Sequence, residues 1–163
     1  MKLKQHMIAA TIILFIVASS VLFLIWPKTC LQLVAEDGSI YLEEPVKEGT
    51  VFSVTFIHSV NKSPVTDYYV IKDGDIYVTS TLYYDFGAGV QSELEEGQTL
   101  EYTEDGGMLI SGFDRKIDPL SYVVGMVSDH VLEINGKTYS LREQCGKGTY
   151  VTFRVATAFD WLR

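Results

Sequence analysis

The first 27 residues contain no acidic side chain, and residues 7–26 contain neither charge nor proline. At a rise of about 1.5 Å per residue, a helix of this length matches a bilayer core about 30 Å thick. The pattern of a cleaved secretory signal is also missing, because the small residues of the run are followed by more apolar residues instead of a cleavage site. A lipoprotein signal is missing as well, because no small residues directly precede Cys30. Since Lys2 and Lys4 precede the run, we expect residues 1–27 to be a cytoplasmic N-terminus and a transmembrane signal anchor. The chain would then be a single-pass protein of the cell membrane with its C-terminal domain outside.

Basic residues are scarce as well. The chain has 13 Lys and Arg residues against 21 Asp and Glu residues, for a formal net charge of −8, and every acidic residue follows the apolar run. A surface of this sign repels the phosphates of nucleic acids and the headgroups of anionic lipids. We therefore expect no nucleic-acid partner, and contact with the bilayer only through residues 7–26.

Proline is rare, with 4 in 163 residues, whereas turn signals such as Asp-Gly and Asn-Gly recur along the chain. They separate short runs rich in β-branched and aromatic residues, a pattern typical of β-strands. The pattern predicts one extracytoplasmic all-β domain over residues 28–163, an antiparallel sandwich or barrel-like fold. The expected strands are Leu31–Ala35, Ser39–Glu43, Val51–Val60, Val65–Lys72, Ile76–Tyr84, Thr99–Thr103, Met108–Ser111, Tyr122–Met126, His130–Ile134, Lys137–Leu141 and Tyr150–Ala156.

Cysteine is limited to Cys30 and Cys145. In an oxidising exterior these two residues could form a disulfide that closes a long loop, which the chain-entropy model values at about 4–5 kcal/mol. Two separate buried thiols are the alternative, because the spacing in the sequence does not give the distance in space. Two cysteines alone are too few ligands for a structural zinc ion.

The stretch "TFIHSVNKSPVTDYYV", residues 55–70, places His58 on the apolar face of an expected strand. If Asn61–Pro64 form a four-residue hairpin loop, His58 lies opposite Asp67, and Tyr69 follows Asp67 on the same face. Such a pair either pins the hairpin as a satisfied polar contact or forms a ligand clamp or proton-sensitive contact in a pocket.

Signals for catalysis are missing. The chain has no G-x-S-x-G elbow, and Ser59 would point to the face opposite His58 on a strand, so this pair does not suit a nucleophile and its base. No phosphate-binding Gly-Lys-Ser/Thr motif is present. We therefore expect neither an enzyme nor a cofactor.

Two further places carry residues that ligands use. Gly87 and Gly89 either let backbone amides approach a ligand or form a bulge at a strand end. His130 stands beside Asp129 at an expected strand start, where turn chemistry explains both residues. The set of His58, Asp67 and His130 has the count of a two-histidine, one-carboxylate metal site, although its spacing is not characteristic of one.

Three segments together carry a family resemblance: "FIHSVNKSPVTDYY" (56–69), "GAG" (87–89) and "VGMVSDHVLEING" (124–136). The chain resembles a bacterial family of small exported proteins, domain of unknown function 1850 (DUF1850). Within that resemblance the family motif falls on His58, Ser59, Val60, Pro64, Val65 and, as its acidic member, Asp67, and the glycine motif falls on Gly87 and Gly89. Glutamate is expected more often at the acidic position, and a proline often follows the glycines where this chain has Val90 and Gln91.

The resemblance implies a partner rather than a reaction. Members of this family tend to be encoded beside TAXI-type TRAP transporters, which pair an extracytoplasmic solute-binding protein with a fused membrane subunit driven by an ion gradient. We therefore expect a membrane-anchored accessory or interaction module whose partner is the transporter's membrane subunit or its solute-binding protein. The alternative is a receptor for a small ligand or ion. Its candidate residues are His58, Ser59, Asp67, Tyr69, Gly87, Gly89 and His130.

Overall fold

The computed structural model of the protein describes residues 11–20, 29–85 and 93–157. The chain divides into a unit of residues 29–156 and a second unit formed by its two ends. In the second unit, residues 11–20 form an α-helix. None of the helices in the described residues has both the length and the apolar character needed to cross a membrane. The rest of the expected span lies outside the described part, so the transmembrane anchor stays a prediction.

The unit of residues 29–156 is built from β-strands, as the sequence predicts. The strands are β1 (Thr29–Ala35), β2 (Ile40–Pro45), β3 (Val51–Ile57), β4 (Pro64–Lys72), β5 (Asp75–Tyr83), β6 (Thr99–Tyr102), β7 (Met108–Lys116), β8 (Leu120–Val123), β9 (His130–Ile134), β10 (Lys137–Ser140) and β11 (Tyr150–Thr157), with a short helix α2 (Leu141–Cys145) before β11.

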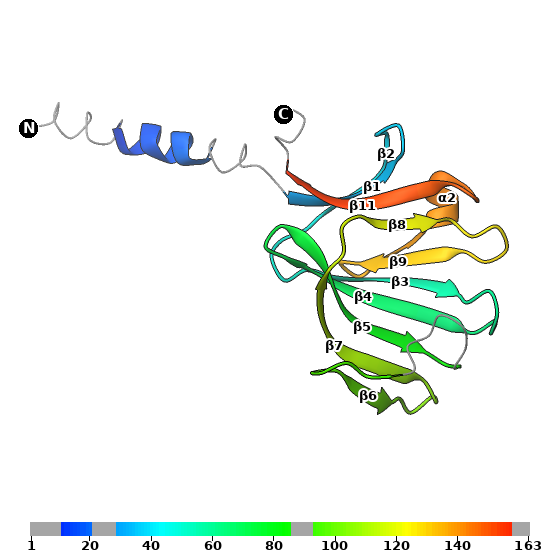
Figure 1. Ribbon diagram of the computed structural model, residues 1–163. Coiled ribbons are helices and arrows are strands. Elements are labelled where there is room, and N and C mark those ends of the chain that lie inside the picture. The colour runs from blue at the N-terminus through cyan, green and yellow to red at the C-terminus, as the bar shows by residue number, and fades with distance from the viewer. Residues whose placement is uncertain (1–10, 21–28, 86–92, 158–163) are drawn as a thin grey trace, which may run out of the picture. The chain divides into compact units, whose positions relative to one another are not determined.

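These strands form two antiparallel sheets. The smaller sheet has four strands in the order β2-β1-β11-β8, and the larger has seven in the order β10-β9-β3-β4-β5-β7-β6. Figure 1 shows the two sheets one above the other, with β8 of the smaller sheet next to β9 of the larger. Within the described residues neither sheet closes on itself, so the fold has the two open layers of a sandwich rather than the closed sheet of a barrel.

Two hairpins of the larger sheet form at turn signals that the sequence shows. Asp73 and Gly74 have φ angles of 55° and 79°, and Asn135 and Gly136 have φ angles of 53° and 72°. Positive φ at both central residues is the mark of a type I′ turn, whose twist matches that of a hairpin. These turns set the pairing of β4 with β5 and of β9 with β10.

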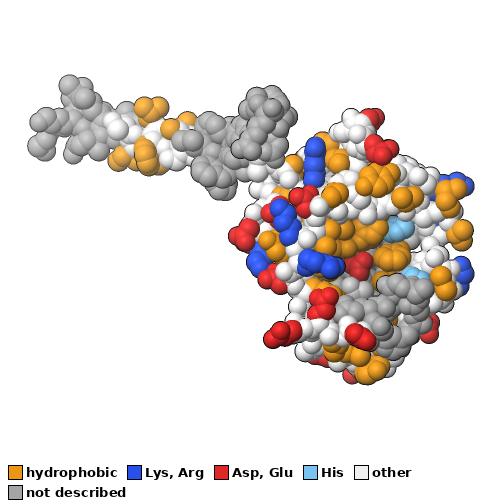
Figure 2. All heavy atoms as spheres, viewed as in Figure 1, with side chains coloured by type: hydrophobic (Ala, Val, Ile, Leu, Met, Phe, Trp, Pro, Cys, Tyr) orange, Lys and Arg blue, Asp and Glu red, His pale blue; other side chains and the backbone are white. Residues whose placement is uncertain are grey.

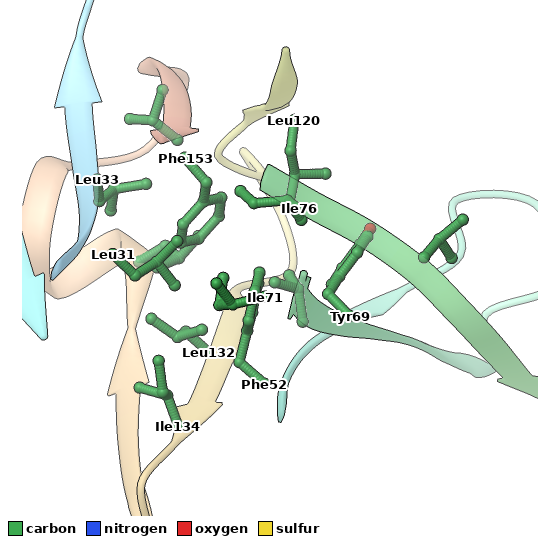
Figure 3. Close-up of a cluster of buried hydrophobic side chains, with 14 of the residues drawn as sticks. Leu31, Leu33, Phe52, Tyr69, Ile71, Ile76, Leu120, Leu132, Ile134 and Phe153 are labelled. Atoms are coloured by element: carbon green, nitrogen blue, oxygen red, sulfur yellow. The ribbon is translucent and has the colours of Figure 1, made fainter. Parts of the chain in front are cut away.

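The main hydrophobic core lies between the two sheets. Leu31 and Phe153 of the smaller sheet and Phe52 and Leu132 of the larger are all buried in it. Figure 3 shows these side chains pointing into a common space, and the ring centroids of Phe52 and Phe153 are 5.9 Å apart. Burial of one such side chain contributes about 1.5–3 kcal/mol, so this core is what holds the sheets against each other.

The structure differs from the sequence prediction at several elements. Strand β3 ends at Ile57 instead of Val60, and β8 covers Leu120–Val123 instead of Tyr122–Met126. Strand β7 continues beyond Ser111 to Lys116, because Gly112, with a φ angle of 91°, forms an irregularity inside the strand instead of ending it. The strand expected to reach Leu141 stops at Ser140, whose side chain accepts a hydrogen bond from Glu143 N and so begins helix α2. A serine N-cap followed by good helix formers was the signal for this helix.

A disulfide between Cys30 and Cys145 is not formed. Both residues belong to the described part and are not bonded to each other. The thiol of Cys145 donates a hydrogen bond of 2.8 Å to the carbonyl oxygen of Leu141 in its own helix, and burial raises the pKa of this thiol. The structure therefore shows two separate thiols, although both are half-buried and not fully buried.

Candidate functional site

Two loops at one end of the sandwich enclose a pocket of about 390 Å³. One loop joins β3 to β4 and the other joins β8 to β9. Ser128 Oγ of the second loop donates a hydrogen bond of 3.5 Å to Ile57 O of the first. The pocket is lined by Phe56, Ile57, His58, Ser59, Lys62, Gly125, Met126, Val127, Ser128 and His130. Figure 2 shows histidine side chains at the surface beside hydrophobic ones on the face in view.

The turn between β3 and β4 lies two residues earlier than the sequence predicts. A backbone hydrogen bond of 2.9 Å from His58 N to Ser63 O closes it, so the loop consists of residues 59–62 instead of 61–64. Pro64 becomes the first residue of β4. This is a place in a strand where the missing N–H of proline is tolerated.

This shift makes the prediction that His58 lies opposite Asp67 wrong. Asp67 lies opposite Val54, and Tyr69 lies opposite Phe52, so the register is displaced by four residues. Four residues of strand span about 13 Å, which separates the imidazole from the carboxylate. Because the displacement is an even number of residues, Asp67 nevertheless stays on the predicted apolar face.

His58 therefore belongs to the turn. Its Nδ1 accepts hydrogen bonds from Val60 N and Asn61 N, each 3.4 Å long, and its carbonyl oxygen accepts one of 3.0 Å from Lys62 N. Ser59 follows it on the turn and also lines the pocket. The imidazole thus holds the loop in shape with one nitrogen, which leaves Nε2 to carry the proton in the neutral form.

His130 lies on the opposite wall of the pocket, at the start of β9. Its Nδ1 accepts a hydrogen bond of 3.2 Å from Gly125 N, and its ring stacks on Phe56 with centroids 5.3 Å apart. Burial lowers the pKa of His130, although the nearby Asp129 carboxylate acts in the opposite direction. His130 is therefore neutral at pH 7, with its proton on Nε2.

Asp129 holds the loop that carries His130 in place through hydrogen bonds. One carboxylate oxygen of Asp129 accepts hydrogen bonds from His130 N (2.7 Å) and Arg142 N (3.0 Å), and the other accepts one from Ser140 Oγ. Arg142 Nη2 donates to Gly125 O at 2.9 Å. These hydrogen bonds outweigh burial and lower the pKa of Asp129. Asp129 is thus a structural residue that positions the pocket loop and does not line the pocket.

Asp67 lies on the inner face of the larger sheet and is not among the residues that line the pocket. On β4 it stands between Val65, which belongs to a second hydrophobic cluster, and Tyr69, which belongs to the main core. Thr81 Oγ1 donates a hydrogen bond of 2.8 Å to one of its oxygens, and Tyr69 donates one of 3.5 Å to the other. Burial raises the pKa of Asp67.

Asp67 is connected to the smaller sheet through two tyrosines. The hydroxyl groups of Tyr69 and Tyr122 share a hydrogen bond of 2.7 Å. The Tyr122 ring lies with its centroid 5.3 Å from that of His130. Burial raises the pKa of both tyrosines, so their hydroxyl groups stay protonated. A continuous set of contacts therefore runs from the pocket wall to the half-buried carboxylate of Asp67.

Two further sequence predictions concern the glycines Gly87 and Gly89 and a possible metal site. Gly87 and Gly89 lie outside the described residues. Within the described part no group of three His, Cys, Asp or Glu side chains is arranged to hold a metal ion, so His58, Asp67 and His130 do not converge on one. The structure brings together His58, Ser59 and His130, and separately Asp67 and Tyr69.

Two residues of the site were missed by reasoning from the sequence. Lys62 lines the pocket, and its φ angle of 59° is unusual for a lysine, so the chain pattern gave no sign of its place. Tyr122 was expected only as part of a strand, because its contacts to Tyr69 and His130 cross between the sheets. A tyrosine in an otherwise apolar strand face is a weak signal of a buried hydrogen-bond partner.

Comparison with known proteins bears directly on the family of this chain. No curated protein and no solved structure matches it. The family model of a domain of unknown function, DUF1850, matches residues 52–141, which include both pocket loops, Asp67 and Tyr122. The match covers more than half of the chain, which therefore belongs to the DUF1850 family.

Proposed function

We propose that this protein is a non-catalytic accessory module of a TAXI-type TRAP transporter. In this proposal residues 7–26 anchor it in the cell membrane and the β domain lies on the outer side. Its partner is the membrane subunit or the solute-binding protein of the transporter. Membership of the DUF1850 family supports the partner, and the charge-free apolar run supports the anchor.

The observation that carries the proposal is an apolar surface on the two pocket loops. Val60, Met126 and Val127 are exposed by 65%, 65% and 92%, and Ile57 at the end of β3 is exposed by 39%. We call these four residues the loop tips; Ile57, Met126 and Val127 line the pocket, and Val60 lies on the loop that joins β3 to β4. Exposed apolar side chains gathered at the mouth of a pocket are typical of a surface that a protein partner covers.

The distribution of charge also favours the face with the loop tips as the docking surface. Among the described residues, the side chains that line the pocket beside the loop tips include Lys62 and no acidic residue, although acidic residues outnumber basic ones in the chain. Elsewhere the described surface carries exposed ion pairs such as Lys72 with Asp114. A partner that approaches the loop tips therefore buries apolar surface without burying an unpaired carboxylate.

Photo-crosslinking in intact cells tests this proposal. A photoreactive amino acid at Val127 of the full-length chain should crosslink to the transporter's membrane subunit or solute-binding protein, identified by mass spectrometry. The matched control is the same amino acid at Tyr102, which is 72% exposed on the edge strand β6 of the larger sheet. Crosslinks to neither transporter polypeptide from Val127, or equal crosslinks from both positions, would contradict the proposal.

A second candidate function is a receptor for a small ligand. The pocket between His58 and His130 favours it, because a volume of about 390 Å³ falls in the range of small-molecule sites. The carboxylate that we expected in this pocket, Asp67, is not among its lining residues. The chemistry of the site therefore differs from that of a histidine and carboxylate clamp.

A further inference from the structure

The pocket between the loops has an unusual charge for this protein. Among the described residues its lining includes Lys62, His58 and His130 and no carboxylate, in a chain whose formal net charge is −8. The nearest acidic side chain on these loops, Asp129, has its oxygens engaged by Ser140 Oγ and by backbone N–H groups. The hollow is thus a place where hydrogen-bond donors gather inside an acidic domain.

Both imidazoles are arranged as donors. The Nδ1 atoms of His58 and His130 accept hydrogen bonds from backbone N–H groups, so the neutral rings carry their protons on Nε2. Among the described residues, neither Nε2 atom is engaged in any hydrogen bond that the structure shows. Two N–H donors and one ammonium group on the walls of one pocket can hold an oxyanion by charge-assisted hydrogen bonds.

The rest of the lining is apolar. Phe56, Ile57, Met126 and Val127 supply hydrophobic walls, and Ser59 and Ser128 add two hydroxyl groups. Phosphate or sulfate would leave these hydrophobic walls without a partner. A small organic acid offers both a charged end and a hydrocarbon part, and the volume of about 390 Å³ admits one.

We infer that this pocket binds a small organic carboxylate. The carboxylate group lies against Lys62 and the Nε2–H groups of His58 and His130, and the hydrocarbon part lies against Phe56 and Met126. The inference deepens the second candidate function and does not depend on association with a transporter. Binding to the purified chain therefore succeeds or fails separately from crosslinking in cells.

Isothermal titration calorimetry on the full-length chain in lipid nanodiscs tests the inference. The probes are benzoate and succinate at millimolar concentration, with benzamide and succinamide as uncharged counterparts of the same shape, and zinc chloride. We expect one carboxylate per chain to bind at least tenfold more tightly than its amide. Failure of both carboxylates to bind, or equal affinity for acid and amide, overturns the inference.

Variants locate the site. Lys62→Gln should weaken carboxylate binding about tenfold, while Lys47→Gln, at an exposed lysine before the start of β3 and outside the pocket, should leave it unchanged. His58→Asn retains an oxygen that can replace Nδ1 in the turn but removes Nε2, so it should weaken binding with no change in the melting temperature of the unbound protein. Carboxylate affinity unchanged by both pocket variants overturns the inference, as does tight binding of zinc with no binding of carboxylates.

Discussion

Tyr69 and Tyr122 join the two sheets through a hydrogen bond of 2.7 Å between their hydroxyl oxygens. Tyr69 stands on β4 of the larger sheet and Tyr122 on β8 of the smaller one. On one side the pair reaches the Asp67 carboxylate, 3.5 Å from the Tyr69 hydroxyl oxygen, and on the other side Tyr122 packs on His130 in the pocket wall. The buried polar cluster and the pocket are therefore neighbours that share one tyrosine.

The substitution Tyr122→Phe removes this bond between the sheets. The hydroxyl group of Tyr69 then keeps only its long contact to Asp67, so we expect the free energy of unfolding to fall by about 1 kcal/mol. Urea unfolding of the full-length protein measures the change. Tyr102→Phe, at a side chain that is 72% exposed, is the control and should have no effect. Equal stability of the two variants would show that the bond does not contribute.

The substitution Asp67→Asn tests the half-buried carboxylate of Asp67. Burial raises the pKa of Asp67 above its ordinary value of 3.8, so the folded protein holds this proton more tightly than the unfolded chain does. The stability that this proton contributes is fully present below pH 3.8 and is lost as the pH rises through the raised pKa. We therefore expect the free energy of unfolding of the natural protein, relative to the variant, to fall as the pH rises and then to level off.

Urea unfolding in a series of buffers from about pH 4 to pH 8 makes this comparison. Asp105→Asn is the matched control, because hydrogen bonds from Thr103 and Tyr84 lower the pKa of Asp105. The stability that Asp105 contributes is present above pH 3.8 and is lost only as the pH falls through the lowered pKa. The difference in the free energy of unfolding between the natural protein and Asp105→Asn should therefore stay constant over this range. If the difference in the free energy of unfolding between the natural protein and Asp67→Asn were also constant with pH, the raised pKa of Asp67 would be contradicted.

Local sequence signals were sufficient for the strands. All eleven expected strands are present, because Asp73-Gly74 and Asn135-Gly136 mark type I′ turns and the runs between the turns alternate in polarity. Features that depend on contacts between distant parts of the chain could not be predicted from the sequence. The turn after His58 could have been placed at residues 61–64 or at 59–62 without breaking the alternation, and only the structure shows that His58 N bonds to Ser63 O.

The sequence predicted only part of the candidate site, because some of its contacts depend on how distant strands pair and pack. His58, Ser59 and His130 were selected from the sequence and meet in one pocket. The pairing of His58 with Asp67 was wrong because a shift of two residues in the turn moves the register by four. The part played by Tyr122 depends on packing of one sheet on the other, which no spacing along the chain encodes.

The substitution Gly125→Ala tests how the pocket loop is held. A Cβ atom at this position would lie 2.0 Å from the carbonyl oxygen of Ser128, so the backbone must move and the hydrogen bond from Gly125 N to His130 Nδ1 is lost. We expect the free energy of unfolding to fall by about 1–3 kcal/mol. Nuclear magnetic resonance should show an altered Nδ1 environment at His130.

The control for this loop variant is Ser128→Ala, which removes only a hydrogen bond of 3.5 Å from an exposed hydroxyl group. We expect its stability and its His130 resonances to stay close to those of the natural protein. An unchanged His130 spectrum in Gly125→Ala would show that the glycine does not position this histidine.

Affinity purification after crosslinking tests most directly the proposal that the loop tips are the surface by which this protein binds a transporter partner. The comparison uses the full-length chain with Val127→Glu, which places a charge at the side chain that is 92% exposed on the pocket rim, and with Tyr102→Glu at the far edge strand. We expect recovery of the transporter polypeptides to fall at least tenfold with Val127→Glu and to be retained with Tyr102→Glu. Equal recovery with both variants, or no recovery with the natural chain, would contradict it.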